Sequence, residues 1–188
     1  KPVNADELIA RVRVHLENRA LLKGLKAYKA RVDEELINAR QMQNMLLPAN
    51  SFIKRTAEKF SLDIAHYFQT SSEIGGDLWG MEEVDDISLA VNTTDFSGHG
   101  IAAALNAFRL HTIFRQGEGD VVASPTDYLA FLNESLTELL PVGQFATMFH
   151  GVINTNENTL SFATAGCPSP IMLLGGKAEI INGAGLPL

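Results

Sequence analysis

The feature that most constrains the fold is a long N-terminal stretch without helix breakers. Residues 4–47 contain no proline and a single glycine, Gly24, and charges of both signs alternate there with apolar residues. This pattern predicts a long helix that ends before Pro48. At about 1.5 Å per residue the helix would extend roughly 65 Å, too far to lie against one small domain throughout. Part of it must therefore project, and Gly24 is a candidate position for a kink or junction.

An apolar seam runs along the second half of this predicted helix. Its members follow a spacing of three and four residues: Leu21, Leu25, Tyr28, Val32, Ala39, Met42 and Leu46. Glu35 interrupts the seam. An exposed apolar seam on a projecting helix is most simply buried against a second copy, which predicts a homodimer through a parallel coiled coil. The alternative is a helix that folds back on its own domain.

Composition excludes several classes of protein. The 188 residues are 46% hydrophobic, enough for one core of ordinary size. The net charge of −7 argues against a nucleic-acid or anionic-membrane partner and suits a cationic partner, including a divalent metal. Cys167 is the only cysteine, and no apolar run approaches the roughly 18 residues that span a bilayer. We therefore expect a cytoplasmic protein, and the absence of an initial Met suggests an excised piece.

After Pro48 the pattern changes to short strands with two inserted helices. Strands are predicted at 62–69, 87–93, 144–153, 160–165 and 171–174. One helix is predicted at 101–115, and a second begins at a cap formed by Ser124 and Pro125 and ends at Leu140. Runs of strands with a block of helices between them predict a layered α+β domain.

Two acidic motifs are candidates for chemistry. One follows the apolar run 87–91 and precedes the helix at 101; it reads Asp95-Phe96-Ser97-Gly98-His99-Gly100. The other reads Glu73-Ile74-Gly75-Gly76-Asp77-Leu78-Trp79, and Asp77 leads into another strand. Carboxylates at strand ends beside glycine turns supply the oxygen ligands that Mg²⁺ and Mn²⁺ prefer. By spacing alone, Asp95 could equally cap the helix, and Asp77 could be a turn residue.

Taken together, these motifs give the chain a resemblance to a known family. The chain resembles the SpoIIE/RsbU-like members of the metal-dependent (type 2C-like) protein phosphatases over residues 41–188. Besides the two acidic motifs, the matching segments are Gln41-Met42-Gln43-Asn44-Met45-Leu46-Leu47-Pro48, Ala102-Ala103-Ala104-Leu105, Leu132-Asn133, Phe145-Ala146-Thr147-Met148 and Ala165-Gly166-Cys167-Pro168-Ser169-Pro170.

The opening of the chain carries a second, shorter resemblance. Lys1-Pro2 followed by residues 7–12 is similar to the last helix of a response-regulator receiver domain, which implies a phosphoacceptor portion upstream. The two resemblances together imply three parts. Residues 1–23 would end the receiver domain, 24–48 would form the coiled-coil linker, and 49–188 would form the phosphatase domain.

The phosphatase resemblance implies a β-sandwich flanked by helices and a site for two Mg²⁺ or Mn²⁺ ions. By position, Asp95 would bridge both metals, the Phe96 carbonyl would ligate one, and Asp77 would hold a metal directly or through a water. The implied reaction is attack of a metal-activated water on phosphoserine or phosphothreonine. The implied substrate is a signalling protein such as an anti-sigma-factor antagonist. His99 is expected to be a structural hydrogen-bonding residue rather than a catalytic one.

One part of the family pattern is missing. The remaining metal ligands of the family lie in a later Thr-Asp-Gly motif, and no such motif occurs in this chain. We therefore expect the phosphatase domain to be incomplete at its C-terminus. The alternative function is a catalytically inactive, phosphatase-like adaptor that binds a signalling partner.

Overall fold

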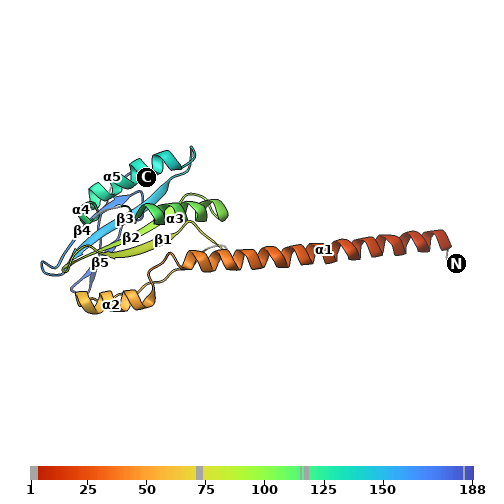
Figure 1. Cartoon of the computed structure of the whole chain (residues 1–188), viewed down its shortest axis with the longest axis horizontal. Helices are drawn as coiled ribbons and strands as arrows, with labels where there is room; N and C mark the ends of the chain where they lie inside the picture. The colour runs from red at the N-terminus through yellow and green to blue at the C-terminus, as the bar shows by residue number, and fades with distance from the viewer. Residues whose placement is uncertain (1–3, 71–73, 115, 117–118, 184) are drawn as a thin grey trace. The chain divides into compact units, whose positions relative to one another are not determined.

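The computed structural model describes residues 4–70, 74–114, 116, 119–183 and 185–188 (Figure 1). Lys1-Pro2 and Glu73 lie outside these residues. The helices are α1 (Ala5–Asn44), α2 (Asn50–Phe60), α3 (Ile101–Phe114), α4 (Gly119–Ala123) and α5 (Pro125–Leu139). The strands are β1 (Leu78–Glu83), β2 (Ser88–Phe96), β3 (Ala146–Asn154), β4 (Thr159–Ala165), β5 (Ile171–Leu174) and β6 (Lys177–Ile180). By its contacts the chain divides into two units, with the boundary between Arg40 and Gln41.

The predicted N-terminal helix is confirmed as α1, which is one uninterrupted helix. The Asn4 side chain accepts a hydrogen bond from the Asp6 backbone N–H at 3.0 Å, and Asp6 and Glu7 place negative charge in the first turn. The helix continues through Gly24, because the penalty of about 1 kcal/mol for one glycine is small against long flanking runs of helix formers. Among the described residues, no helix combines the length and apolar character needed to cross a membrane.

The strands confirm the predicted α+β class. Four of them form an antiparallel sheet in the order β1-β2-β3-β4, and β5 pairs with β6 in a separate two-stranded sheet. The strand predicted at 62–69 is wrong: these residues follow α2 and belong to no strand. Leu62 and Ile64 still pack against buried residues, so their alternation reflects packing on a core rather than pairing in a sheet.

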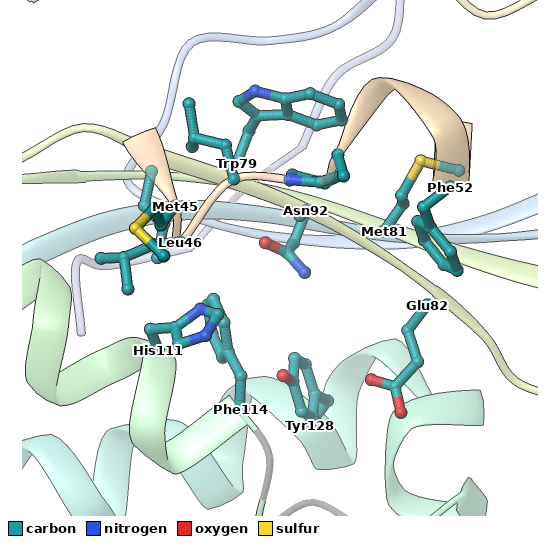
Figure 2. A pocket seen from close by; sticks show the side chains of 15 residues that line it. Met45, Leu46, Phe52, Trp79, Met81, Glu82, Asn92, His111, Phe114 and Tyr128 are labelled. Carbon is teal, nitrogen blue, oxygen red and sulfur yellow. The ribbon is translucent and has the colours of Figure 1, made fainter. Parts of the chain in front are cut away.

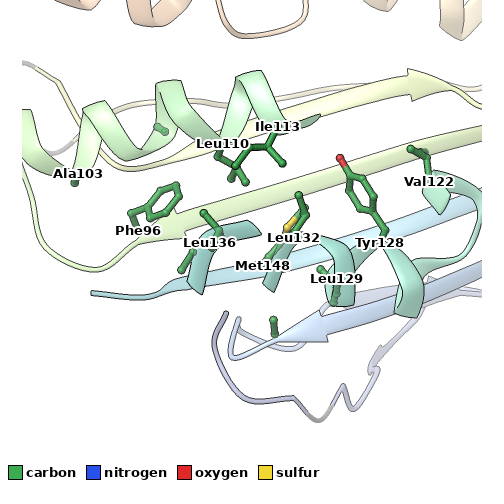
Figure 3. Packing of buried hydrophobic residues seen from close by; sticks show 14 of the residues in the cluster. Phe96, Ala103, Leu110, Ile113, Val122, Tyr128, Leu129, Leu132, Leu136 and Met148 are labelled. Atoms are coloured by element: carbon green, nitrogen blue, oxygen red, sulfur yellow. The ribbon is translucent and has the colours of Figure 1, made fainter. Parts of the chain in front are cut away.

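Helices cover both faces of the four-stranded sheet (Figure 1). On one face α3 and α5 pack on β2 and β3 around a large apolar core, part of which Figure 3 shows. Leu110, Leu132 and Met148 are completely buried in this core. On the other face Ile53 and Phe60 of α2 pack against Met81 and Leu89. The helix α2 was not predicted from the sequence.

Polar contacts add to the apolar packing of α2 against β1. The Lys59 ammonium lies 2.9 Å from the Glu83 carboxylate and 3.1 Å from that of Asp86. The Thr56 hydroxyl donates to Glu83 at 3.2 Å. The hydrogen bond from Lys59 is the main cause that lowers the pKa of Glu83. Glu83 therefore stabilises the docking of α2 most when it is ionised.

We predict that Glu83→Gln lowers the free energy of unfolding by about 0.5 to 1 kcal/mol at neutral pH. Because the folded-state pKa of Glu83 lies below the unfolded value of about 4.3, its contribution is complete above that value and is lost as the pH falls through the folded pKa. Urea denaturation at a series of pH values from 7 downward follows this loss. Glu58→Gln, on the exposed side of α2, is the control. An equal loss in the control, or a difference between Glu83→Gln and the wild type that does not shrink as the pH falls, would contradict the prediction.

Candidate functional site

The pairing of β1 with β2 brings the two sequence-predicted carboxylates together. Leu78 pairs with Thr94 in the antiparallel register, so Asp77, one residue earlier, stands opposite Asp95, one residue later. On its other side Asp95 pairs with Thr147 of β3. Asp95 lies within β2, six positions before the first residue of α3. It is therefore a strand residue and does not cap that helix.

The side chains of Asp77 and Asp95 lie close enough for a hydrogen bond between them. Loss of solvent raises the pKa of Asp77, and the charge of Asp95 and a hydrogen bond between the two side chains raise it further. Asp77 is half-buried and Asp95 is exposed. Two carboxylates held together without a counter-charge destabilise each other. A divalent cation bound by both would relieve that repulsion, so the pair is chemically suited to a hard metal ion.

The backbone of Phe96 lies beside Gly76, the residue that precedes Asp77. Its ring is buried in the core, with 1% of the residue exposed, and its carbonyl lies beside Gly76. A Cβ atom at Gly76 would lie 3.1 Å from the Phe96 carbonyl oxygen and 3.0 Å from the Cβ atoms of Phe96 and Ala103. Glycine is needed at position 76 because the backbone passes so close to Phe96 and α3. The Phe96 carbonyl is thus a third oxygen near the two carboxylates.

The turn after Phe96 is fixed by backbone contacts. The Ser97 N–H donates to the Phe145 carbonyl at 2.9 Å, and the Phe145 N–H donates to the Ser97 hydroxyl at 3.0 Å. Gly98 and Gly100 have φ values of 94° and 74°, in the region that favours glycine. His99, between them, is exposed. These contacts hold the end of β2 in place before the chain enters α3.

Gln43, near the end of α1, supports the turn that carries Asp77. It is 1% exposed, and its side-chain amide makes two hydrogen bonds with Gly75. The Gln43 Nε2 donates to the Gly75 carbonyl at 2.5 Å, and the Gly75 N–H donates to Gln43 Oε1 at 3.2 Å. Gln43 lies in one of the segments that match the family, but the sequence predicted no role for it. A glutamine that will be buried and one that will be exposed cannot be told apart from the neighbouring residues in the sequence.

The donor set of the site is small. Within the described residues, no group of three or more acidic, histidine or cysteine side chains is placed to hold a metal ion. The candidate ligands named from the sequence resemblance are the Asp77 and Asp95 carboxylates, which stand opposite each other on β1 and β2, and the Phe96 carbonyl, which lies beside Gly76.

We predict that Gln43→Leu lowers the free energy of unfolding by about 2 kcal/mol, because the Gly75 N–H and carbonyl would be left buried without their partner. The substitution keeps the side-chain size, so packing alone should change little. Gln41→Leu, two residues earlier and exposed, should change it by less than about 0.5 kcal/mol. Denaturant unfolding of both variants measures the difference. Equal effects would show that the paired amide contributes nothing specific.

Comparison with known proteins agrees with this fold. The family described as Stage II sporulation protein E (SpoIIE) matches residues 85–188. Phosphoserine phosphatase RsbP of Bacillus subtilis (strain 168) is 27% identical over 145 residues, which cover 75% of this chain and 34% of RsbP. The chain thus spans about a third of the length of that relative.

Solved structures of two related domains share the fold. The SiaA-PP2C domain of Pseudomonas aeruginosa superposes with a TM-score of 0.71 at 17% identity, over 86% of this chain and 63% of that one. The PP2C phosphatase domain of SpoIIE from Bacillus subtilis, solved with a fragment of its regulatory domain, gives a TM-score of 0.53 at 16% identity, over 61% of this chain and 33% of that one. With more than half of its residues matched by the family, this chain belongs to the family described as Stage II sporulation protein E (SpoIIE).

Proposed function

We propose that this chain is the output module of a bacterial response regulator and that it removes phosphate from a phosphoserine or phosphothreonine of a partner protein. The observation that carries the proposal is the pairing of Asp77 with Asp95, two repelling carboxylates at the ends of adjacent strands. Because the chain belongs to the SpoIIE family, we interpret this pair as ligands of a divalent metal ion. The similar relative RsbP is itself named a phosphoserine phosphatase.

Asp77, Asp95 and the Phe96 carbonyl would hold Mg²⁺ or Mn²⁺. Their oxygen-only chemistry and the mutual repulsion of the carboxylates fit such ions. A bound divalent ion would supply a water made nucleophilic at neutral pH and would neutralise charge on the phosphoryl oxygens. The chain then needs no nucleophile of its own. In agreement, burial raises the pKa of the only cysteine, Cys167, and so disfavours a reactive thiolate.

A catalytically inactive adaptor is the second candidate, and the size of the donor set favours it. The described residues offer two carboxylates and one carbonyl at the site, with no third acidic group beside them. Fewer carboxylates hold a divalent ion more weakly. An adaptor would keep the fold and the partner-binding surface without turnover. Metal binding and phosphate release, measured on the same sample, separate the two candidates.

The substrate would be a phosphorylated signalling protein such as an anti-sigma-factor antagonist, and a receiver domain would regulate the site. In this proposal residues 1–23 end the receiver, 24–48 form a dimeric coiled-coil linker, and 49–188 form the phosphatase domain. Gln43 gives the linker a direct connection to the site, because its amide holds the turn before Asp77. A shift of the linker helix would therefore move the backbone that carries one of the two carboxylates.

We predict that Asp95→Asn abolishes Mn²⁺-dependent release of phosphate from a phosphoserine protein, by roughly 1000-fold or more, since a metal stabilises transition-state charge by several kcal/mol. In metal-free buffer at pH 7 the same variant should unfold at a higher temperature than the wild type, because the repulsion on Asp77 is removed. Added Mn²⁺ should stabilise the wild type and leave the variant unchanged. Phosphate release and thermal melts provide the two measurements.

Asp63→Asn, which removes an exposed acid just after α2, is the matched control and should behave as the wild type in both measurements. Mn²⁺ stabilisation without phosphate release in the wild type would favour the adaptor. Unchanged phosphate release in Asp95→Asn would overturn the metal site itself.

We predict that the linker helix forms a dimer and that charged residues introduced into its apolar seam separate the two chains. In a single chain Leu25 is 64% exposed, and Tyr28 and Met42 are similarly open to solvent. Leu25→Lys combined with Val32→Lys should convert the dimer to a monomer in sedimentation velocity, because like charges would face each other across the seam. Ala30→Lys, on the opposite side of the helix, should remain dimeric. A wild-type monomer would contradict the coiled coil.

A further inference from the structure

A cavity of about 610 Å³ runs along the outer edge of β1, within the second unit (Figure 2). Its lining includes five consecutive residues of β1, 78–82. Successive side chains of a strand point to opposite faces of the sheet, so a cavity lined by all five follows the edge of the strand rather than one face. Its volume falls within the range of about 300 to 1,000 Å³ found for binding sites.

The backbone groups on this edge of β1 are free to pair. β1 stands at one end of the four-stranded sheet, and the Val84 N–H donates to the Ser88 carbonyl at 3.0 Å in the turn that joins it to β2. Hydrogen-bonded and non-hydrogen-bonded pairs alternate along an antiparallel ladder, so the backbone groups of Trp79 and Met81 point away from β2. In the part of the chain that the structure describes, they make no backbone hydrogen bond with any other segment.

The ladder between β2 and β3 agrees with this assignment. The Thr155 N–H donates to the Ile87 carbonyl at 2.9 Å, and the Ser97 N–H donates to the Phe145 carbonyl at 2.9 Å. The odd-numbered residues of β2 therefore bond to β3, and its even-numbered residues bond to the even-numbered residues of β1. The outward groups of β1 are thus those of its odd-numbered residues.

The cavity has apolar walls on both faces of the sheet. Phe52 of α2 lies on the same face as Trp79 and Met81. Phe114 and Tyr128 lie on the opposite face, in the core beneath α3 and α5. Figure 2 shows Trp79 on one side of the strands and Phe114 and Tyr128 on the other. An extended segment in this cavity would meet apolar surface with the side chains of both its faces.

The shape of the cavity favours a single extended segment over a second folded domain. Residues 45–49, between α1 and α2, form its remaining wall, so helices and chain stand around the open edge. A strand can enter such a groove, whereas a sheet edge that carries its own helices would collide with these walls. Natural edge strands that avoid pairing often carry lysine or proline. Residues 78–81 carry neither charge nor proline.

We propose that the cavity binds an extended segment of a partner protein, which joins the sheet as a strand beside β1. Its main chain hydrogen-bonds with the outward backbone groups of Trp79 and Met81, and its alternate side chains contact the two apolar walls. Five strand residues span roughly 17 Å, so a segment of about five residues with apolar or β-branched side chains fits. Binding uses neither Asp77 nor Asp95, so this inference does not depend on the phosphatase reaction.

A short peptide tests the strand. The probe is acetyl-Ser-Val-Thr-Val-Thr-Ser-amide, titrated into the chain while the emission of Trp79, its single tryptophan, is followed. We expect saturable binding with a dissociation constant of roughly 1 mM or below. Two isomers serve as matched controls, one N-methylated at both valines and the other at both threonines.

Alternate N–H groups of a strand point to the same edge, so only one isomer loses its hydrogen bonds to β1. That isomer should bind at least about tenfold more weakly than the parent peptide, and the other within about threefold of it. Equal binding by the two isomers, or the absence of saturable binding by the parent, would overturn the proposal.

A pair of variants tests β1 itself. Met81→Pro removes the outward N–H, and Met81→Val keeps it with a side chain of similar size. Proline is tolerated on an edge strand where its nitrogen points away from the partner strand. Met81→Pro should bind the peptide at least about tenfold more weakly than Met81→Val. Circular dichroism establishes folding, and the N-methylated isomers decide the question if Met81→Pro does not fold. Equal binding by the two folded variants would contradict the proposal.

A second copy of this chain is the other occupant that experiment can reveal. Sedimentation velocity at rising protein concentration would then show assemblies larger than a dimer, and these would disappear in Met81→Pro. Such assemblies would assign the edge of β1 to self-association and overturn the proposal. Their absence, together with peptide binding, supports a partner segment.

Discussion

The structure of this domain depends on the register between β1 and β2. The pairing of Leu78 with Thr94 sets Asp77 opposite Asp95, and a shift of one residue would separate the carboxylates and turn the side chains of one strand to the other face. The register is held by burial on both faces, since Leu89 packs beneath α2 while Phe96 packs beneath α3. Apolar packing thus stabilises an arrangement that electrostatic repulsion opposes. The proposed cation site would require such a balance.

The end of α1 is joined to this arrangement by hydrogen bonds rather than by apolar contact. Gln43 pairs with both backbone groups of Gly75, and the following turn at Gly76 lies against the Phe96 carbonyl. A buried amide with both hydrogen-bonding groups satisfied is directional, so it fixes a position more sharply than an apolar side chain would. This gives a physical reason for a polar residue at a fully buried position next to an exposed helix.

The structure differs from the sequence prediction in the segment 62–69 and in the helix α2. The alternation over residues 62–69 predicted a strand, yet these residues belong to no strand. The helix α2 was not predicted, and its N-cap is Ala49, which has no side chain that could mark the start of a helix by a capping hydrogen bond. Its apolar residues Phe52, Ile53 and Phe60 do carry a helical spacing. The acidic pair was found because both carboxylates sit beside glycines at strand ends.

The sequence by itself determined the long helix, the α+β class, the family and the identities of Asp77, Asp95 and Phe96 as candidate ligands. These follow from local patterns, since helix breakers, alternation and glycine turns act over a few residues. Only the tertiary structure decided that the two carboxylates face each other, that Gln43 holds Gly75, and that the Asn92 amide packs against Gly80. Each of these joins residues far apart in the chain or on different strands. Their contact depends on register and layer packing, which no local pattern encodes.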